Sequence, residues 1–495
     1  MAARMPLAQR WSRVTLAWLP FADAASADVT LSRLLRLSLF QVSVGMMTVL
    51  LNGTLNRVLI VELGIHAWLV SLMIAIPLLA APFRALIGHR SDVHRSVLGW
   101  RRVPFIWFGT LMQFGGLAIM PFALLLMRDP HLFPVGLAAS ALAFLLAGIG
   151  MHTTQTAGLA LVGDLLPEDR RARAVALLYL ALLAGMMVCS TILGGLLNHF
   201  TPTRLVQVIQ ACAVLTFVLN VVALWKQEAR SEAIASPQTP RPAFSVVWQR
   251  YAAQPMTMRL LATVGLGAAA FAMQDPLLEP YGGQVLHLSV GATTSLSGAW
   301  ALGALAGFAL SARWLGGGID ALRIAGYGVV LGIAAFLLVI FAAPLQSPLA
   351  LGLGALVIGA GAGLFSVGTL TAAMGVAGGV AGGVAAGMAG NDAASADMAG
   401  LALGAWGAVQ TTAAGLAIAF GGVLRDLVST FAVSDGLGPT LAHHATGYGV
   451  IYAIEIALLL VTLVLMGPLV GRLAGSRAAS STAGARRFGL TEFPT

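Results

Sequence analysis

Residues 67–127 read AWLVSLMIAIPLLAAPFRALIGHRSDVHRSVLGWRRVPFIWFGTLMQFGGLAIMPFALLLM, which is two apolar runs separated by an arginine-rich turn. Each run has about 20 residues or more, the length that an α-helix needs to cross the hydrocarbon core of a bilayer. The turn between them contains Arg84, Arg90, Arg95, Arg101 and Arg102. Apolar runs that alternate with basic loops predict membrane-spanning helices and also predict their orientation.

The same pattern continues along the whole chain. Hydrophobic residues make up 58% of the 495 residues and charged residues only 9%, whereas roughly a quarter of a soluble domain is charged. We therefore expect an all-α polytopic membrane protein. Its twelve predicted transmembrane helices lie near residues 36–60, 67–88, 102–127, 134–161, 173–197, 204–225, 259–281, 291–313, 322–343, 348–374, 399–424 and 447–470.

The basic residues fall mostly on one side of these predicted helices. Of the 28 Lys and Arg residues, 24 lie on the side of both termini, and the other side has only Arg57, Arg128, Arg204 and Arg425. The positive-inside rule places both termini in the cytoplasm. Anionic lipid head groups explain the net charge of +9, and no basic stretch has the interleaved aromatic residues that are typical of a nucleic-acid surface.

A polar, proline-bearing stretch divides the helices into two sets of six. We expect a cytoplasmic N-terminal segment (1–35), a six-helix bundle (36–225), a cytoplasmic linker (226–258), a second bundle (259–470) and a cytoplasmic tail (471–495). Weak repeats support a duplication, since Gly88-x-x-x-Asp92 follows the second helix and Gly316-x-x-x-Asp320 follows the eighth. This organisation is typical of the major facilitator architecture.

Sequence motifs of enzymes and metal sites are absent. The only lysine, Lys226, follows Trp225, so there is no phosphate-binding Gly-Lys-[Ser/Thr] loop. No Gly-x-Ser-x-Gly or His-Glu-x-x-His motif occurs, and the two cysteines, Cys189 and Cys212, lie inside predicted helices. The sequence therefore indicates neither an enzyme nor a resident metal.

Two cytoplasmic loops are candidates for a gate. Acidic and basic residues stand close together in both, so that ion pairs can form across the loops, and a charged turn that obeys the positive-inside rule is the alternative interpretation. The residues of the predicted cytoplasmic gate are Gly88, Asp92, Arg95, Arg101, Arg102, Asp164, Glu168 and Arg171.

Two charged residues near the outer ends of the first and seventh helices are candidates for an outer latch. Arg57 and Glu279 occupy equivalent positions in the two halves, so their opposite charges suggest a contact that opens and closes; independent exposure at the membrane surface is the alternative. Asn56, Gln274 and Asp275 belong to the same region.

Polar residues inside a span are costly unless they are paired or face a cavity. His152, Gln155 and Thr156 share one face of the fourth helix, where they are candidates for binding a substrate or, through the imidazole, a chlorin magnesium. Bonding between helices is the alternative. Glu455 is a lone acid in the twelfth helix and a candidate for proton coupling, or else a helix–helix contact.

Several stretches together resemble one known family. They are Gly53-Thr-Leu-Asn-Arg57, Ala81-Pro-Phe-Arg84, Gly99-Trp-Arg-Arg-Val-Pro104, Gln274-Asp-Pro-Leu-Leu-Glu279-Pro-Tyr-Gly-Gly283 and Arg487-Phe-Gly-Leu-Thr-Glu-Phe-Pro494. In these stretches the chain resembles the PucC/LhaA family, the bacteriochlorophyll-delivery branch of the major facilitator superfamily. The similarity runs through nearly the whole chain.

The resemblance implies a role in assembling light-harvesting complexes in the inner or intracytoplasmic membrane of a phototrophic bacterium. It implies antenna polypeptides, bacteriochlorophyll and the lipid bilayer as partners, with bacteriochlorophyll as a bound ligand and no covalent cofactor. Two other interpretations stay open at this point. One is a docking chaperone for antenna helices that moves no pigment, and the other is a proton-coupled transporter of a small solute.

Overall fold

The computed structural model describes residues 29–79, 100, 102–166, 168–228, 253, 256–385, 392–434 and 444–470. Ten helices in these ranges are long and apolar enough to cross a membrane, and α4 (Ala67–Leu79) and α11 (Thr257–Ala272) are two shorter apolar helices. Together they correspond to the twelve expected spans. The predicted all-α membrane fold is confirmed.

The first six spans form the N-terminal bundle. Its first span is made of several short helical segments and the other five are single helices. The elements are α2 (Leu31–Leu37), α3 (Leu39–Thr48), η2 (Val49–Leu55), η3 (Val58–Glu62), α4, α6 (Val103–Leu126), α7 (Phe133–Leu165), α8 (Glu168–Leu196) and α9 (Pro202–Leu224).

The last six spans form the C-terminal bundle. Its first span is divided into two helices, as described below. The elements are α11, α12 (Leu278–Val285), α13 (Val290–Gly316), α14 (Ala321–Ala342), α15 (Pro348–Ala385), α16 (Asp392–Val433), α17 (His444–Met466) and the short η4 (Gly467–Leu469).

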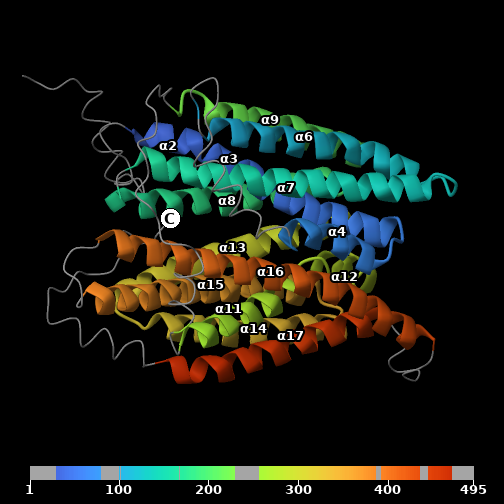
Figure 1. Ribbon diagram of the computed structural model, residues 1–495. Coiled ribbons are helices and arrows are strands. Elements are labelled where there is room, and N and C mark those ends of the chain that lie inside the picture. Colours follow the sequence, from blue (N-terminus) through green and yellow to red (C-terminus); the bar gives the residue numbers. More distant parts are fainter. Residues whose placement is uncertain are drawn as a thin grey trace, which may run out of the picture.

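The two bundles lie side by side and meet along two pairs of helices (Figure 1). Helix α4 packs against α16, and α8 packs against α13. We call the end where α2 begins and α9 finishes the linker end, and the opposite end, where the first span finishes at Glu62 and α13 begins, the far end. This division is needed because the bundles contact each other differently at the two ends.

The first span of each bundle is irregular. In the N-terminal bundle, η2 and η3 are π-helical segments within the span. In the C-terminal bundle, the helix breaks between Ala272 and Leu278, where the sequence contains Pro276. Proline has no N–H to donate and disfavours helical geometry in the preceding residue, so the break follows directly from the sequence.

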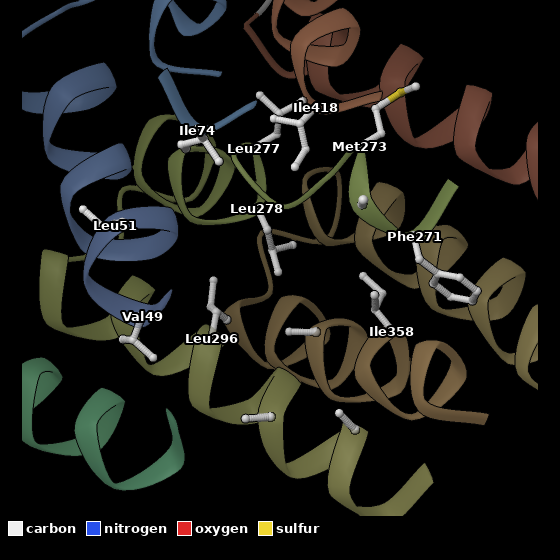
Figure 2. Close-up of a cluster of buried hydrophobic side chains, with 14 of the residues drawn as sticks. Val49, Leu51, Ile74, Phe271, Met273, Leu277, Leu278, Leu296, Ile358 and Ile418 are labelled. Carbon is white, nitrogen blue, oxygen red and sulfur yellow. The ribbon is translucent and has the colours of Figure 1, made fainter. Parts of the chain in front are cut away.

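Two clusters of buried apolar side chains hold the described helices together. The larger cluster runs through both bundles, and Figure 2 shows Ile74 of the N-terminal bundle near Leu277 of the C-terminal one, and Val49 near Leu296. The smaller cluster, which includes Phe40 and Leu161, belongs only to the linker end of the N-terminal bundle. The apolar core is therefore shared between the bundles away from that end.

Two helices extend beyond the predicted spans. Helix α15 continues to Ala385 and α16 reaches Val433, whereas the expected spans finish at 374 and 424. Residues 375–385 are rich in glycine, a poor helix former, so local propensity does not predict the extension of α15, and hydropathy alone does not mark where a helix ends. The longer α16 places Arg425 inside a helix, although we expected it in a loop.

Candidate functional site

The hydrogen bonds between the two bundles lie at the far end. Between described residues, Thr54 and Thr294 share a hydroxyl contact of 3.1 Å, and Asn56 Nδ2 donates to the Pro276 carbonyl at 2.6 Å. The Trp68 backbone N–H donates to Asp426 Oδ2 at 2.9 Å. Since all of these residues lie in the far halves of their helices, the bundles are joined there.

Small residues allow this close approach. A Cβ atom at Gly291 of α13 would overlap the Gly194 carbonyl of α8 and lie 2.9 Å from the Cα of Asn198. Glycine at this position therefore lets two backbones touch, as is common where membrane helices cross. The contact between α8 and α13 depends on a residue that has no side chain.

Arg57 and Glu279 lie across the interface in a reciprocal arrangement. A Cβ at Gly53 would overlap Glu279 Oε1, and a Cβ at Gly283 would lie 3.1 Å from Arg57 Nε. Each charged side chain therefore covers a glycine of the other bundle, four residues from the other charged residue. Both residues are only 3% exposed, so the interface buries them.

A direct ion pair between Arg57 and Glu279 is not formed, although the two are close enough to attract each other. Arg57 instead pairs with Glu62 and donates from Nη2 to the Leu288 carbonyl at 3.1 Å. Glu279 Oε1 accepts a hydrogen bond of 2.7 Å from Ser297. Arg57 Nε and Glu279 Oε2 have no hydrogen-bond partner among the described residues. Both groups therefore keep bonding capacity inside the interface.

The other residues of the predicted latch surround the break in the seventh span. Gln274 Nε2 donates to Asp275 Oδ1 at 2.7 Å, and Asn56 contacts the next residue, Pro276. The structure thus brings all five predicted latch residues to one region. It lies where the π-helical first span meets the broken seventh span, and discontinuous helices of this kind often form the sites of membrane carriers.

Arg425 is a buried residue that we wrongly expected in a loop. It is 6% exposed, forms an ion pair of 2.7 Å with Asp426 and donates to Gln284 and to the Tyr448 hydroxyl, the latter at 3.0 Å. Its guanidinium carbon also lies 4.5 Å from the centre of the Tyr448 ring. A buried charge needs such partners, and none of them can be recognised from the local sequence except Asp426.

The described residues of the predicted cytoplasmic gate form contacts inside the N-terminal bundle. Arg102 Nε pairs with Asp164 Oδ2 at 2.8 Å, and the Glu228 carboxylate accepts from the backbone N–H of Val103 at 3.0 Å. Arg171 Nε donates to the Leu166 carbonyl at 3.0 Å. Glu168 is the first residue of α8. Gly88, Asp92, Arg95 and Arg101 lie outside the described residues.

The predicted binding residues of the fourth span lie in α7. His152 is 9% exposed, and the Thr156 hydroxyl donates to its backbone carbonyl at 2.8 Å. Gln155 Nε2 lies 3.4 Å from Gln41 Oε1 of the first span. The three side chains are thus near the contact of the first and fourth spans.

Glu455 lies in the middle of α17 and is 0% exposed. Neither of its carboxyl oxygens has a partner with good hydrogen-bond geometry among the described residues, although the Gln274 backbone N–H lies nearby. Its carboxyl group interacts electrostatically with that of Asp275. The predicted lone acid therefore has a second acid as its neighbour, which the sequence pattern did not indicate.

Comparison with known proteins identifies relatives of this chain. The family model described as PUCC protein matches residues 54–474. A Rhodobacter capsulatus relative named "Uncharacterized protein in puhA-bchM intergenic region" is 51% identical over 97% of this chain and 98% of its own. "Protein PucC" of Rhodovulum sulfidophilum is 51% identical over 83% of this chain and 88% of its own.

A solved structure of similar fold is that of a bacterial homologue of the human lysosomal transporter Spinster. It superimposes with a TM-score of 0.65 over 92% of this chain and 98% of its own, at 14% sequence identity. The likeness at this level of identity concerns the fold, which is that of the major facilitator transporters. With the family model covering most of the sequence, the chain belongs to the PUCC protein family.

Proposed function

We propose that this protein is an assembly factor that binds bacteriochlorophyll and delivers it to nascent light-harvesting antenna polypeptides. Membership of the PUCC family, together with relatives that bear the name PucC, supports a role in photosynthesis. The excess of arginine on the side of both termini supports a cytoplasmic linker end in the inner or intracytoplasmic membrane of a bacterium.

The observation that carries the proposal is that the hydrogen bonds between described residues of the two bundles lie at the far end. Thr54–Thr294 and Trp68–Asp426 join the bundles there, whereas the described gate contacts, such as Arg102–Asp164, stay within one bundle. In a two-bundle carrier, contacts of this kind close one side of the membrane. A cargo would then enter from the linker end.

The distribution of charge favours an apolar cargo. Among the described residues, charged side chains in the linker halves of the helices lie within their first or last two turns, for example Arg36, Asp164 and Arg313. The buried Arg57, Arg425 and Glu279 lie in the far halves instead, and the buried Arg102 directly precedes α6 at the linker end. Because an apolar pigment with a long hydrocarbon tail needs no charged lining, this surface suits it better than a small polar solute.

His152, Gln155 and Thr156 are the residues that we expect to contact the pigment. A neutral imidazole can ligate a magnesium ion of a chlorin ring. In this proposal, Gln155 and Thr156 supply hydrogen-bonding groups to the polar edge of the pigment. All three lie in the linker-side part of α7, on the side from which the cargo would enter.

An absorbance spectrum tests the proposal directly. The protein would be purified in mild detergent from a host that makes bacteriochlorophyll but lacks antenna polypeptides, with the variants His152→Ala and Glu279→Gln. His131→Ala is the matched control because His131 is exposed at the far end. We expect stoichiometric near-infrared absorbance that His152→Ala abolishes and that His131→Ala and Glu279→Gln retain.

Two other results would have different meanings. A colourless protein that still captures antenna polypeptides would overturn delivery and identify a docking chaperone. A pigmented protein that keeps its full absorbance in His152→Ala would support pigment binding but contradict the proposed position of the ligand.

A further inference from the structure

Two carboxyl groups in the C-terminal bundle, of the half-buried Asp275 and the buried Glu455, have no basic partner among the described residues. Asp275 lies in the break of the seventh span and Glu455 in the middle of α17, and the two interact electrostatically. The ion pairs that Arg57, Arg102 and Arg425 form with described residues include neither Asp275 nor Glu455. Two neighbouring negative charges are therefore not balanced by the protein.

The groups around Glu455 point to an incomplete site. The Tyr452 hydroxyl, one turn away on α17, is fully buried, has no hydrogen-bond partner among the described residues and interacts electrostatically with Glu455. The Glu455 oxygens likewise have no partner with good hydrogen-bond geometry, and the Gln274 backbone N–H is the polar group near them. Buried polar groups nearly always have partners, so three oxygens in one place indicate something that binds between them.

An aromatic layer separates this site from the far end. The Tyr281 ring lies 5.3 Å from that of Tyr448 and 5.6 Å from that of Tyr452, and Phe336 stacks on Tyr452 at 6.2 Å. Tyr448 and Tyr452 precede Glu455 along α17, which starts at the far end. The layer therefore shields the two acids on that side, and an ion would reach them from the linker end.

Other charged groups on the neighbouring helices lie elsewhere. Arg425 and Asp426 of α16 contact Tyr448 on the far side of the aromatic layer. Arg259 of α11 donates to the Leu465 carbonyl near the linker end, at 2.8 Å. The charged residue of α14 is Arg323, in its first turn. None of these elements supplies a described cation to the pair.

We propose that Asp275 and Glu455 together bind one small monovalent cation, either a proton or Na⁺. Two carboxylates that share a buried site cannot both stay ionised without one, because their mutual repulsion adds to the cost of removing each charge from water. A shared proton leaves one acid neutral, and Na⁺ offsets one of the two negative charges while taking oxygen ligands from both acids. The site does not depend on pigment delivery, since a docking chaperone would have it as well.

Binding at this pair links ion occupancy to the contact between the bundles. Asp275 precedes Pro276, whose carbonyl accepts the hydrogen bond from Asn56 of the N-terminal bundle. When the cation leaves, repulsion between Asp275 and Glu455 acts on the break between α11 and α12, because Asp275 is part of that break. Loss of the ion therefore favours separation of the far end, and binding favours its closure.

Infrared spectroscopy of the full-length protein in lipid nanodiscs tests the site. The protonated carboxyl group has its own C=O stretching band, which would be recorded across a pH series with and without Na⁺. The variants are Glu455→Gln and Asp275→Asn. The control is Asp320→Asn, since Asp320 caps α14 by accepting the Leu322 N–H at 3.0 Å, outside the site.

For a proton site, we expect a band equivalent to one carboxyl group per chain, which Glu455→Gln removes and Asp320→Asn retains. For a Na⁺ site, we expect the same band without Na⁺ and its loss when Na⁺ is added, with Asp275→Asn abolishing the Na⁺ effect. The variant Glu455→Asp keeps a carboxyl group and should shift the band. Such a shift assigns the band to residue 455 even when Glu455→Gln does not fold. The proposal is overturned when wild-type spectra contain no such band at any pH and do not respond to Na⁺.

Discussion

The two ends of the interface between the bundles differ in kind. At the far end, side chains and backbones of both bundles meet, as in Thr54–Thr294 and Gly194–Gly291. At the linker end, the described polar contacts stay within one bundle, as in Arg102–Asp164 of the N-terminal bundle and Arg259–Leu465 of the C-terminal one. The comparison teaches that the same pair of bundles is tightly joined at one end while each bundle is stabilised separately at the other.

Locking the far end should have the largest effect on function. In a background with Cys189→Ala and Cys212→Ala, the pair Thr54→Cys and Thr294→Cys places thiols where hydroxyl groups now lie 3.1 Å apart. We expect a disulfide under oxidising conditions and complete loss of antenna assembly, measured as light-harvesting absorbance in cells. The two single variants are the controls, and unchanged assembly in the cross-linked protein would contradict a need for the far end to open.

Removing Arg425, which is buried at the far end, should have the largest effect on stability. Arg425→Met leaves Asp426, Gln284 and Tyr448 without their common partner. Breaking a buried ion pair in this way costs roughly 3–5 kcal/mol. The measurement is thermal unfolding in detergent by tryptophan fluorescence, with Arg204→Met, an exposed arginine, as control. Equal unfolding midpoints for the two variants would contradict the buried network.

Enlarging Gly291 should weaken the contact between the bundles, with a smaller loss of stability than Arg425→Met. Gly291→Val introduces atoms into the backbone contact with Gly194 and Asn198, and overpacking of this kind costs about 1–3 kcal/mol. Gly352→Val is the matched control, because nothing lies within 4 Å of a Cβ at Gly352 and the gain in helix propensity is the same. A lower unfolding midpoint in Gly291→Val alone would support the tight contact at the far end, and equal midpoints would contradict it.

The linker end should respond least. Asp164→Asn weakens the ion pair with Arg102, but the Asp164 side chain is 41% exposed, and exposed pairs contribute roughly 0–1 kcal/mol. We expect a small change in the unfolding midpoint and unchanged cross-linking of the Thr54→Cys and Thr294→Cys pair. Loss of that cross-link on Asp164→Asn would show that this end controls the far end after all.

Hydropathy and the arginine pattern were enough to predict the twelve spans and two bundles, because each span is a local property of the chain. They were not enough for Arg425, whose burial depends on Gln284 and Tyr448, residues of other helices. They also did not show that Asp275 lies beside Glu455. Such contacts are set by how the helices pack, and a single sequence contains no direct signal of that packing.

For the predicted outer latch, too, the sequence did not reveal which residues pair. The equivalent positions of Arg57 and Glu279 in the two halves suggested a contact that opens and closes. The structure pairs Arg57 with Glu62 and places Glu279 beside Ser297 and Gly53. The reason is geometric: two glycines leave space that the long charged side chains fill.

The reciprocal fit of Gly53 with Glu279 and of Gly283 with Arg57 also has an evolutionary consequence. A larger residue at 53 leaves no room for a side chain as long as glutamate at 279, and a larger residue at 283 restricts the arginine at 57 in the same way. Sequence drift at each glycine is therefore tied to the length of a side chain more than two hundred positions away. The four residues should be inherited as two linked pairs, which change together or not at all.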